Sequence, residues 1–155
     1  MSASTDAKRA LRSAARFYAV QALFQMESSG QTVDRVRTEF ETYRIGAEGD
    51  EETWVEADLD LFRTLVDMAV DQQARIDQMT DRALVVKWPI ARIDPTLRAL
   101  FRAAGAELVE TRTPPRVIIT EYVQLAQAFF PEGRESKFVN AVLDHMAHEA
   151  RPEAF

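Results

Sequence analysis

Three basic residues near the amino terminus, Lys8, Arg12 and Arg16, are spaced four residues apart, and Arg9 lies beside them. On a helix this spacing places the three cations on one ridge, where each pair repels by roughly a few tenths of a kcal/mol. A phosphate backbone would remove that cost, so the ridge predicts contact with nucleic acid. Two other interpretations remain open: a solvated helix face, or an ion pair between Arg16 and a carboxylate such as Glu107 on a neighbouring helix.

The last apolar segment carries an aromatic residue at its margin. On a helical projection Phe138 lies about 90° from the centre of the apolar face. Lys137 points nearly opposite to that face, and Asn140 lies on its far flank. An aromatic ring beside a cation and an amide is suited to stacking on an unpaired base. The alternative is that Phe138 only closes the rim of the core. The apolar face itself consists of Val139, Val142, Leu143 and Met146.

Few residues could support catalysis or hold a metal. The chain has no cysteine, which excludes a cysteine nucleophile, an iron-sulfur centre, a thiolate zinc site and a disulfide scaffold. The common glycine-rich, serine-hydrolase and paired-histidine motifs are also absent. His145, His148 and Glu149 could place three ligands near one helix end, but solvated side chains there are the simpler interpretation. The sequence therefore predicts a protein that is not an enzyme, with no catalytic residues, metal or cofactor.

Charge is distributed unevenly along the chain. The formal net charge of −6 argues by itself against a nucleic-acid partner. Residues 1–16 are nevertheless basic, and ten carboxylates lie between Asp34 and Asp60. A protein with a basic end and an acidic middle can hold a polyanion locally and repel it elsewhere. No window has the length and apolarity of a membrane span or signal peptide, so we expect a cytoplasmic protein without membrane contact.

The elements that must position these residues are predicted to be helices. Apolar residues recur every three or four positions, and capping or turn residues separate the periodic stretches. Val117–Thr120 has strand propensity, but the apolar positions continue at helical steps through Ile119, Val123, Ala126 and Phe130, which is too long for a strand. The result is an all-α fold of about seven helices. Helices are expected from Thr5 or Asp6 to Ser29, from Thr32 to Tyr43, from Asp58 to Leu84 in one piece or with a bend near Gln72-Gln73, from Pro95 with Asp94 as its cap to Val109, from Arg116 to Phe130, and from Ser136 to Met146.

Several motifs follow one another along these helices. The first helix contains Arg12-Ser-Ala-Ala-Arg16 and Ala19-Val-Gln-Ala-Leu-Phe24-Gln25. The middle of the chain contains Lys87-Trp88-Pro-Ile-Ala-Arg92, then Leu97-Arg98-Ala-Leu-Phe-Arg102 with Glu107-Leu108. The last helices contain Val117-Ile-Ile-Thr-Glu121-Tyr-Val-Gln-Leu-Ala126 and Lys137-Phe-Val-Asn-Ala-Val-Leu-Asp144. In this order the motifs resemble those of the NusB family of bacterial transcription antitermination factors, and the resemblance covers nearly the whole chain.

The resemblance implies an all-helical fold of two small packed bundles, with residues 1–155 forming a single RNA-binding domain. It implies binding to the boxA element of nascent RNA together with NusE, a small-subunit ribosomal protein. It also implies a place in an RNA polymerase antitermination complex with other Nus factors, which supports processive ribosomal RNA transcription. By matching positions, the expected RNA-binding residues are Lys8, Arg9, Arg12, Arg16, Lys137, Phe138 and Asn140.

One departure from the family pattern has a structural consequence. Gly105-Ala106 stand where the family commonly has an aromatic residue before Glu107-Leu108, which predicts looser packing near Glu107. Two alternative functions remain. One is the helical RNA-binding domain of a ribosomal RNA methyltransferase, and the other is a helical module that binds only protein. RNA binding should weaken steeply with salt, which separates it from protein binding.

Overall fold

The computed structural model describes residues 3–47, 55–84, 93–133 and 135–155, and every regular element within them is a helix. This confirms the predicted all-α fold, and Val117–Thr120 lies inside a helix. The elements are α1 (Ala3–Ser29), α2 (Val33–Tyr43), α3 (Leu59–Asp71), α4 (Gln73–Ala83), α5 (Pro95–Glu110), α6 (Pro115–Phe129), α7 (Glu135–Ala150) and the short 3-10 helix η2 (Pro152–Ala154).

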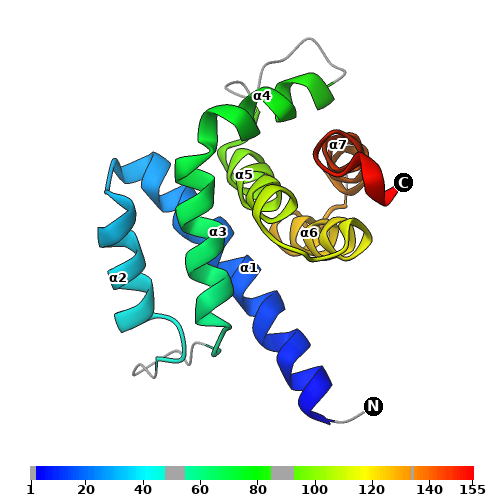
Figure 1. The fold of residues 1–155 in the computed structure, drawn as a ribbon. Coiled ribbons are helices and arrows are strands. Elements are labelled where there is room, and N and C mark those ends of the chain that lie inside the picture. The colour runs from blue at the N-terminus through cyan, green and yellow to red at the C-terminus, as the bar shows by residue number, and fades with distance from the viewer. Residues whose placement is uncertain (1–2, 48–54, 85–92, 134) are drawn as a thin grey trace.

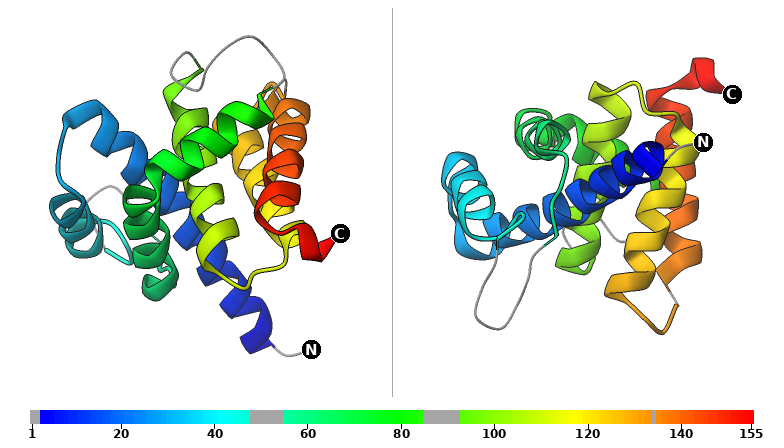
Figure 2. Two further views of the ribbon diagram at one scale, coloured as in Figure 1. Left: turned by 45° about the horizontal axis from the view of Figure 1, so that its top comes forward. Right: turned by 90° about the horizontal axis from the view of Figure 1, so that it is seen from below.

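The helices form two groups that meet at α5 (Figure 1). In the first group α1, α2 and α3 pack against one another, and α4 to α7 form the second. α5 belongs to the second group but also contacts α1 and α3, so it joins the two. α6 and α7 form an antiparallel hairpin (Figure 2). The amino-terminal end of α1 projects beyond its neighbours (Figure 1).

Three helices begin where short-range sequence signals predict. The side chain of Thr32 accepts a hydrogen bond from the backbone N–H of Arg35 and begins α2. Asp58 caps α3 in the same way, and Asp94 caps α5 with Pro95 at the first helical position. Such caps satisfy amide groups that have no partner within the helix, so they fix the helix start independently of tertiary packing.

Other boundaries differ from the prediction. α1 begins at Ala3, so Thr5 and Asp6 lie in its first turn and do not precede it. α7 begins at Glu135, one residue before Ser136, the expected cap. The segment expected from Asp58 to Leu84 is two helices, because Gln72 leaves helical geometry with φ −106° and ψ 18°. The breaks and motif expected around Trp88-Pro89, and the acidic stretch 48–54, lie outside the described residues.

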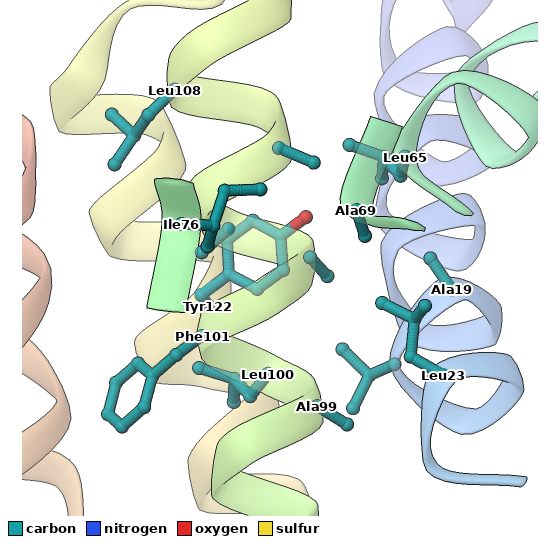
Figure 3. Close-up of a cluster of buried hydrophobic side chains, with 14 of the residues drawn as sticks. Ala19, Leu23, Leu65, Ala69, Ile76, Ala99, Leu100, Phe101, Leu108 and Tyr122 are labelled. Atoms are coloured by element: carbon teal, nitrogen blue, oxygen red, sulfur yellow. The ribbon is translucent and has the colours of Figure 1, made fainter. Parts of the chain in front are cut away.

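α5 is the centre of the core. Its residues from Leu97 to Leu108 are buried apart from the half-buried Arg102, and the apolar ones pack in a cluster with side chains of α1, α3, α4 and α6 (Figure 3). The expectation of looser packing near Glu107 is wrong. A Cβ on Gly105 would overlap the side chain of Ile76 on α4, and Glu107 is fully buried. Gly105 therefore allows α4 and α5 to approach closely, and this close approach takes the place of an aromatic side chain.

Candidate nucleic-acid interface

Three of the predicted basic residues lie on the projecting end of α1. Lys8, Arg9 and Arg12 are exposed, and within the described part of the chain none of them has an ion pair or a side-chain hydrogen bond. Their charges are therefore available to a partner. These residues are accessible because neither α3 nor α5 covers the first turns of this 27-residue helix (Figure 1).

Arg16 differs from these three and requires a correction. Its side chain is only 1% exposed, and its guanidinium forms a bidentate pair with Glu107 on α5. Arg16 Nε lies 2.9 Å from Glu107 Oε1, and Nη2 lies 2.8 Å from Oε2. The predicted exposed ridge thus ends at Arg12, because α5 and α6 cover α1 from Ala15 onward. The ion pair with Glu107, which the sequence left open as an alternative, is what the structure contains.

A hydrogen-bonded network surrounds this pair. Arg16 Nη1 also donates to Glu121 Oε1 at 3.1 Å, and the Ser13 hydroxyl donates to the same oxygen at 2.9 Å. The Tyr122 hydroxyl donates to Glu107 Oε1 at 3.0 Å. Buried polar groups are tolerated when all of them have partners in this way. The network attaches α1 to α5 and α6 through Ser13 and Arg16, which follow Arg12 in the helix. It therefore fixes the position of Arg12 relative to α5 and α6.

Burial and the neighbouring carboxylates shift two pKa values in this network. Burial alone would lower the pKa of Arg16, but the hydrogen bonds and the charge of Glu107 outweigh it and raise that pKa above its ordinary value. Burial raises the pKa of Tyr122 well above its usual range, and the negative charge of Glu107 adds to the effect. Arg16 therefore stays charged and Tyr122 stays neutral at any physiological pH.

The sequence did not indicate Tyr122 as a core residue. The predicted apolar face of this helix ran through Ile119, Val123, Ala126 and Phe130, whereas Ile118, Tyr122 and Ala126 are the buried positions. On the inward face the Tyr122 hydroxyl donates to Glu107, fifteen residues earlier in the chain. The sequence signal for a buried Tyr122 would have been a buried carboxylate at Glu107. The burial of Glu107 can be recognised only after α5 and α6 are packed together.

The second predicted region lies at the start of α7. Lys137 and Asn140 are exposed, as their positions on the helical projection predict. Phe138 is half-buried and packs edge to face on Phe101 of α5, with 6.1 Å between ring centroids and 64° between planes. Its position at the margin of the core is therefore confirmed. Its stacking on a base stays a prediction, because the ring is both part of the core rim and partly accessible.

The two regions lie at opposite ends of the α6–α7 hairpin. The basic end of α1 is next to the start of α6, and α7 begins at the far end of α6 (Figure 2). α6 has 15 residues, which corresponds to a length of about 22 Å. One base or one phosphate cannot contact both regions. A ligand that reaches both must be extended along the hairpin.

Among the described residues, no group of three His, Cys, Asp or Glu side chains is arranged to hold a metal ion. His148 Nδ1 lies 2.9 Å from the carbonyl oxygen of Asp144, and its ring stacks on Phe155 with 3.6 Å between centroids. In the same part of the chain, no helix combines the length and apolarity needed to cross a membrane.

An all-helical fold with exposed, unpaired cations on a projecting helix is typical of a helical protein that binds a polyanion. Comparison with known proteins identifies the family. Residues 13–148 match the NusB family, and the chain belongs to it. It is 47% identical over 146 residues to the transcription antitermination protein NusB of Maricaulis maris, covering 94% of this chain and 91% of that protein.

Solved structures agree with this assignment. T. maritima NusB is 28% identical and superposes with a TM-score of 0.74, covering 93% of this chain and 96% of that one. A second structure is described as antitermination factors NusB and NusE in complex with double-stranded RNA. Its matching chain is 23% identical, with a TM-score of 0.68 and coverage of 88% of this chain and 96% of that one, which shows a shared fold.

Proposed function

We propose that this protein is a cytoplasmic transcription antitermination factor that binds the boxA element of nascent RNA jointly with NusE. The observation that carries the proposal is the set of exposed, unpaired cations Lys8, Arg9 and Arg12 on α1 of a NusB family member. A related fold in complex with NusE and RNA supports the choice of partners. The pair would enter an RNA polymerase antitermination complex with other Nus factors and support processive ribosomal RNA transcription.

In this proposal the protein acts by binding, and its residues divide into two kinds. Lys8, Arg9 and Arg12 neutralise phosphates at the basic end of α1, and Lys137, Phe138 and Asn140 contact the strand at the start of α7. Arg16 touches no RNA. It holds α1 on α5 and α6 through Glu107 and Glu121, so that the exposed cations keep one orientation.

The test is a titration with boxA RNA and with a scrambled RNA of the same composition, each with and without NusE. We expect NusE to raise the affinity for boxA more than for the scrambled RNA, because the exposed basic surface of this acidic protein is small and carries no sequence information by itself. A duplex form of boxA serves as a third ligand, because stacking by Phe138 requires unpaired bases.

The other outcomes are informative. Equal enhancement on both RNAs would mean that NusE adds only charge, which contradicts joint recognition of boxA. No binding of any RNA, with or without NusE, would leave the protein-only interpretation. No observation favours a methyltransferase domain.

A further inference from the structure

An open groove of about 700 Å³ separates the amino-terminal half of α1 from α6. Arg9 and Arg12 lie on the α1 side, and Arg116, Thr120 and Gln124 lie on the α6 side. Arg116 is one of the first residues of α6, and it is exposed. The exposed cations of α1 therefore have a counterpart on a second helix, across a hollow that is open to solvent.

The charge in this groove is not compensated from within. Its lining contains one carboxylate, Glu121, which already accepts hydrogen bonds from Arg16 and Ser13. Within the described residues Arg9, Arg12 and Arg116 have no ion pair. Several arginines on other helices, by contrast, are paired with carboxylates: Arg37 with Asp67, Arg63 with Glu41, Arg82 with Glu149, and Arg102 with Asp77.

Three unpaired guanidinium groups that face one hollow repel each other, and a bound anion would remove that repulsion. The shape of the groove indicates which anion. It is open, and its α6 side continues as a ridge, because Arg116, Thr120 and Gln124 are spaced four residues apart and all are exposed. This ridge follows α6 from the basic end of α1 toward the end where α7 and Lys137 begin (Figure 2). An extended polyanion fits this course better than a small anion.

We propose that Arg116 binds a backbone phosphate of RNA in the groove between α1 and α6, opposite Arg9 and Arg12. Thr120 and Gln124 continue the contact along α6 with neutral hydrogen-bond donors. The strand thereby spans the distance between the two regions that were predicted from sequence. This inference rests on the proposed RNA-binding function and adds to it a binding residue and a path for the strand.

The experiment compares Arg116→Ala with Arg35→Ala in titrations of boxA and scrambled RNA, in the presence of NusE and at several salt concentrations. Arg35 is the matched control, because it is an exposed arginine on α2, far from the groove, and its removal changes the net charge equally. We expect Arg116→Ala to weaken binding of both RNAs about two- to fivefold at low salt. The log-log salt slope should become less steep by about 0.7, as expected for one lost phosphate on a single strand.

A neutral methylphosphonate linkage placed at successive positions of the RNA locates the phosphate. At one position the neutral linkage should weaken binding to the unsubstituted protein but not to the Arg116→Ala variant. Thermal melting should be unchanged in both variants, since within the described residues neither side chain has a hydrogen bond or an ion pair.

Two results would overturn the inference while leaving the proposed function intact. One is unchanged affinity and salt slope in Arg116→Ala when the unsubstituted protein binds boxA. The other is an equal loss in Arg116→Ala and Arg35→Ala, which would show a general effect of net charge. If the unsubstituted protein binds no RNA, the proposed function itself fails, and this inference fails with it.

Discussion

Phe138 and Val142 lie one turn apart on α7 but face different surroundings. Val142 is 3% exposed and packs inside the core. Phe138 is half-buried and packs edge to face with Phe101 at the margin of the core. The same kind of truncation should therefore affect different properties at the two positions.

Val142→Ala should lower the free energy of unfolding by about 1 to 2 kcal/mol through lost burial and a partial cavity, with little direct effect on RNA binding. Phe138→Leu keeps an apolar side chain on Phe101 but removes the aromatic ring. It should cost less than about 1.5 kcal/mol of stability and lower RNA affinity by about 1 to 3 kcal/mol, the usual range for a stacked base. Thermal melts and RNA titrations on both variants measure this. Normal RNA affinity of a folded Phe138→Leu variant would assign Phe138 to the core rim alone.

Arg16 shows what residue spacing can and cannot predict. Lys8, Arg12 and Arg16 share one spacing, yet only the first two are exposed. Breaking a buried, hydrogen-bonded ion pair by removing one partner costs about 3 to 5 kcal/mol, so substitution of Arg16 would act through folding before it acted on RNA. The sequence supplied Glu107 as one possible partner. It could not show that α5 covers α1 at this level, because that depends on packing between residues 91 positions apart.

At the scale of the helix, Arg151 connects the end of α7 to the end of α5 and to the turn before α6. It follows α7, and its guanidinium donates to backbone carbonyls at the end of α5 and in the turn before α6. Nε lies 2.7 Å from the Leu108 oxygen, and Nη1 lies 2.8 Å from the Thr113 oxygen. The last carbonyls of a helix have no partner within it, so a cation here satisfies them and also favours the negative end of the helix dipole.

Arg151→Ala should therefore lower the free energy of unfolding by about 1 to 3 kcal/mol, because several buried carbonyls lose a charged donor. Amide hydrogen exchange should accelerate most around the junction of α5 and α6. Arg112→Ala is the control, since Arg112 is an exposed arginine in the same turn without a hydrogen bond in the described structure. Equal destabilisation by the two substitutions would contradict the role given to Arg151.

The elements themselves were more predictable than their packed faces. Caps such as Asp94 act over two or three residues, so the sequence could place them, whereas the starts expected at Thr5 or Asp6 and at Ser136 were wrong. The inward face of α6 includes Tyr122, whose hydroxyl donates to Glu107 on α5, a contact that no local pattern encodes. The contact of Gly105 with Ile76 is of the same kind, since the missing side chain has meaning only when α4 lies against α5.

For the molecule as a whole, the net charge of −6 conflicts with RNA binding only if charge acts at long range. Salt limits that range to about 8 Å at physiological ionic strength. The attraction of RNA to the exposed cations at the basic end of α1 and in the groove therefore depends on the charges close to them. Many of the carboxylates elsewhere form ion pairs with arginines, as Asp67 does with Arg37 and Asp77 with Arg102.

This separation of charge predicts different effects for two double variants with the same net charge. Arg9→Ala/Arg12→Ala removes two groove cations, and Arg35→Ala/Arg75→Ala removes two exposed cations from α2 and α4. The groove variant should reduce the steepness of the log-log salt slope of RNA binding by about 1.4, which corresponds to two phosphates on a single strand. The remote variant should leave the slope unchanged near 0.15 M salt, because neither of its side chains lines the groove. Equal slopes for the two variants would show that the overall field of the protein, and not the local groove, governs the approach of RNA.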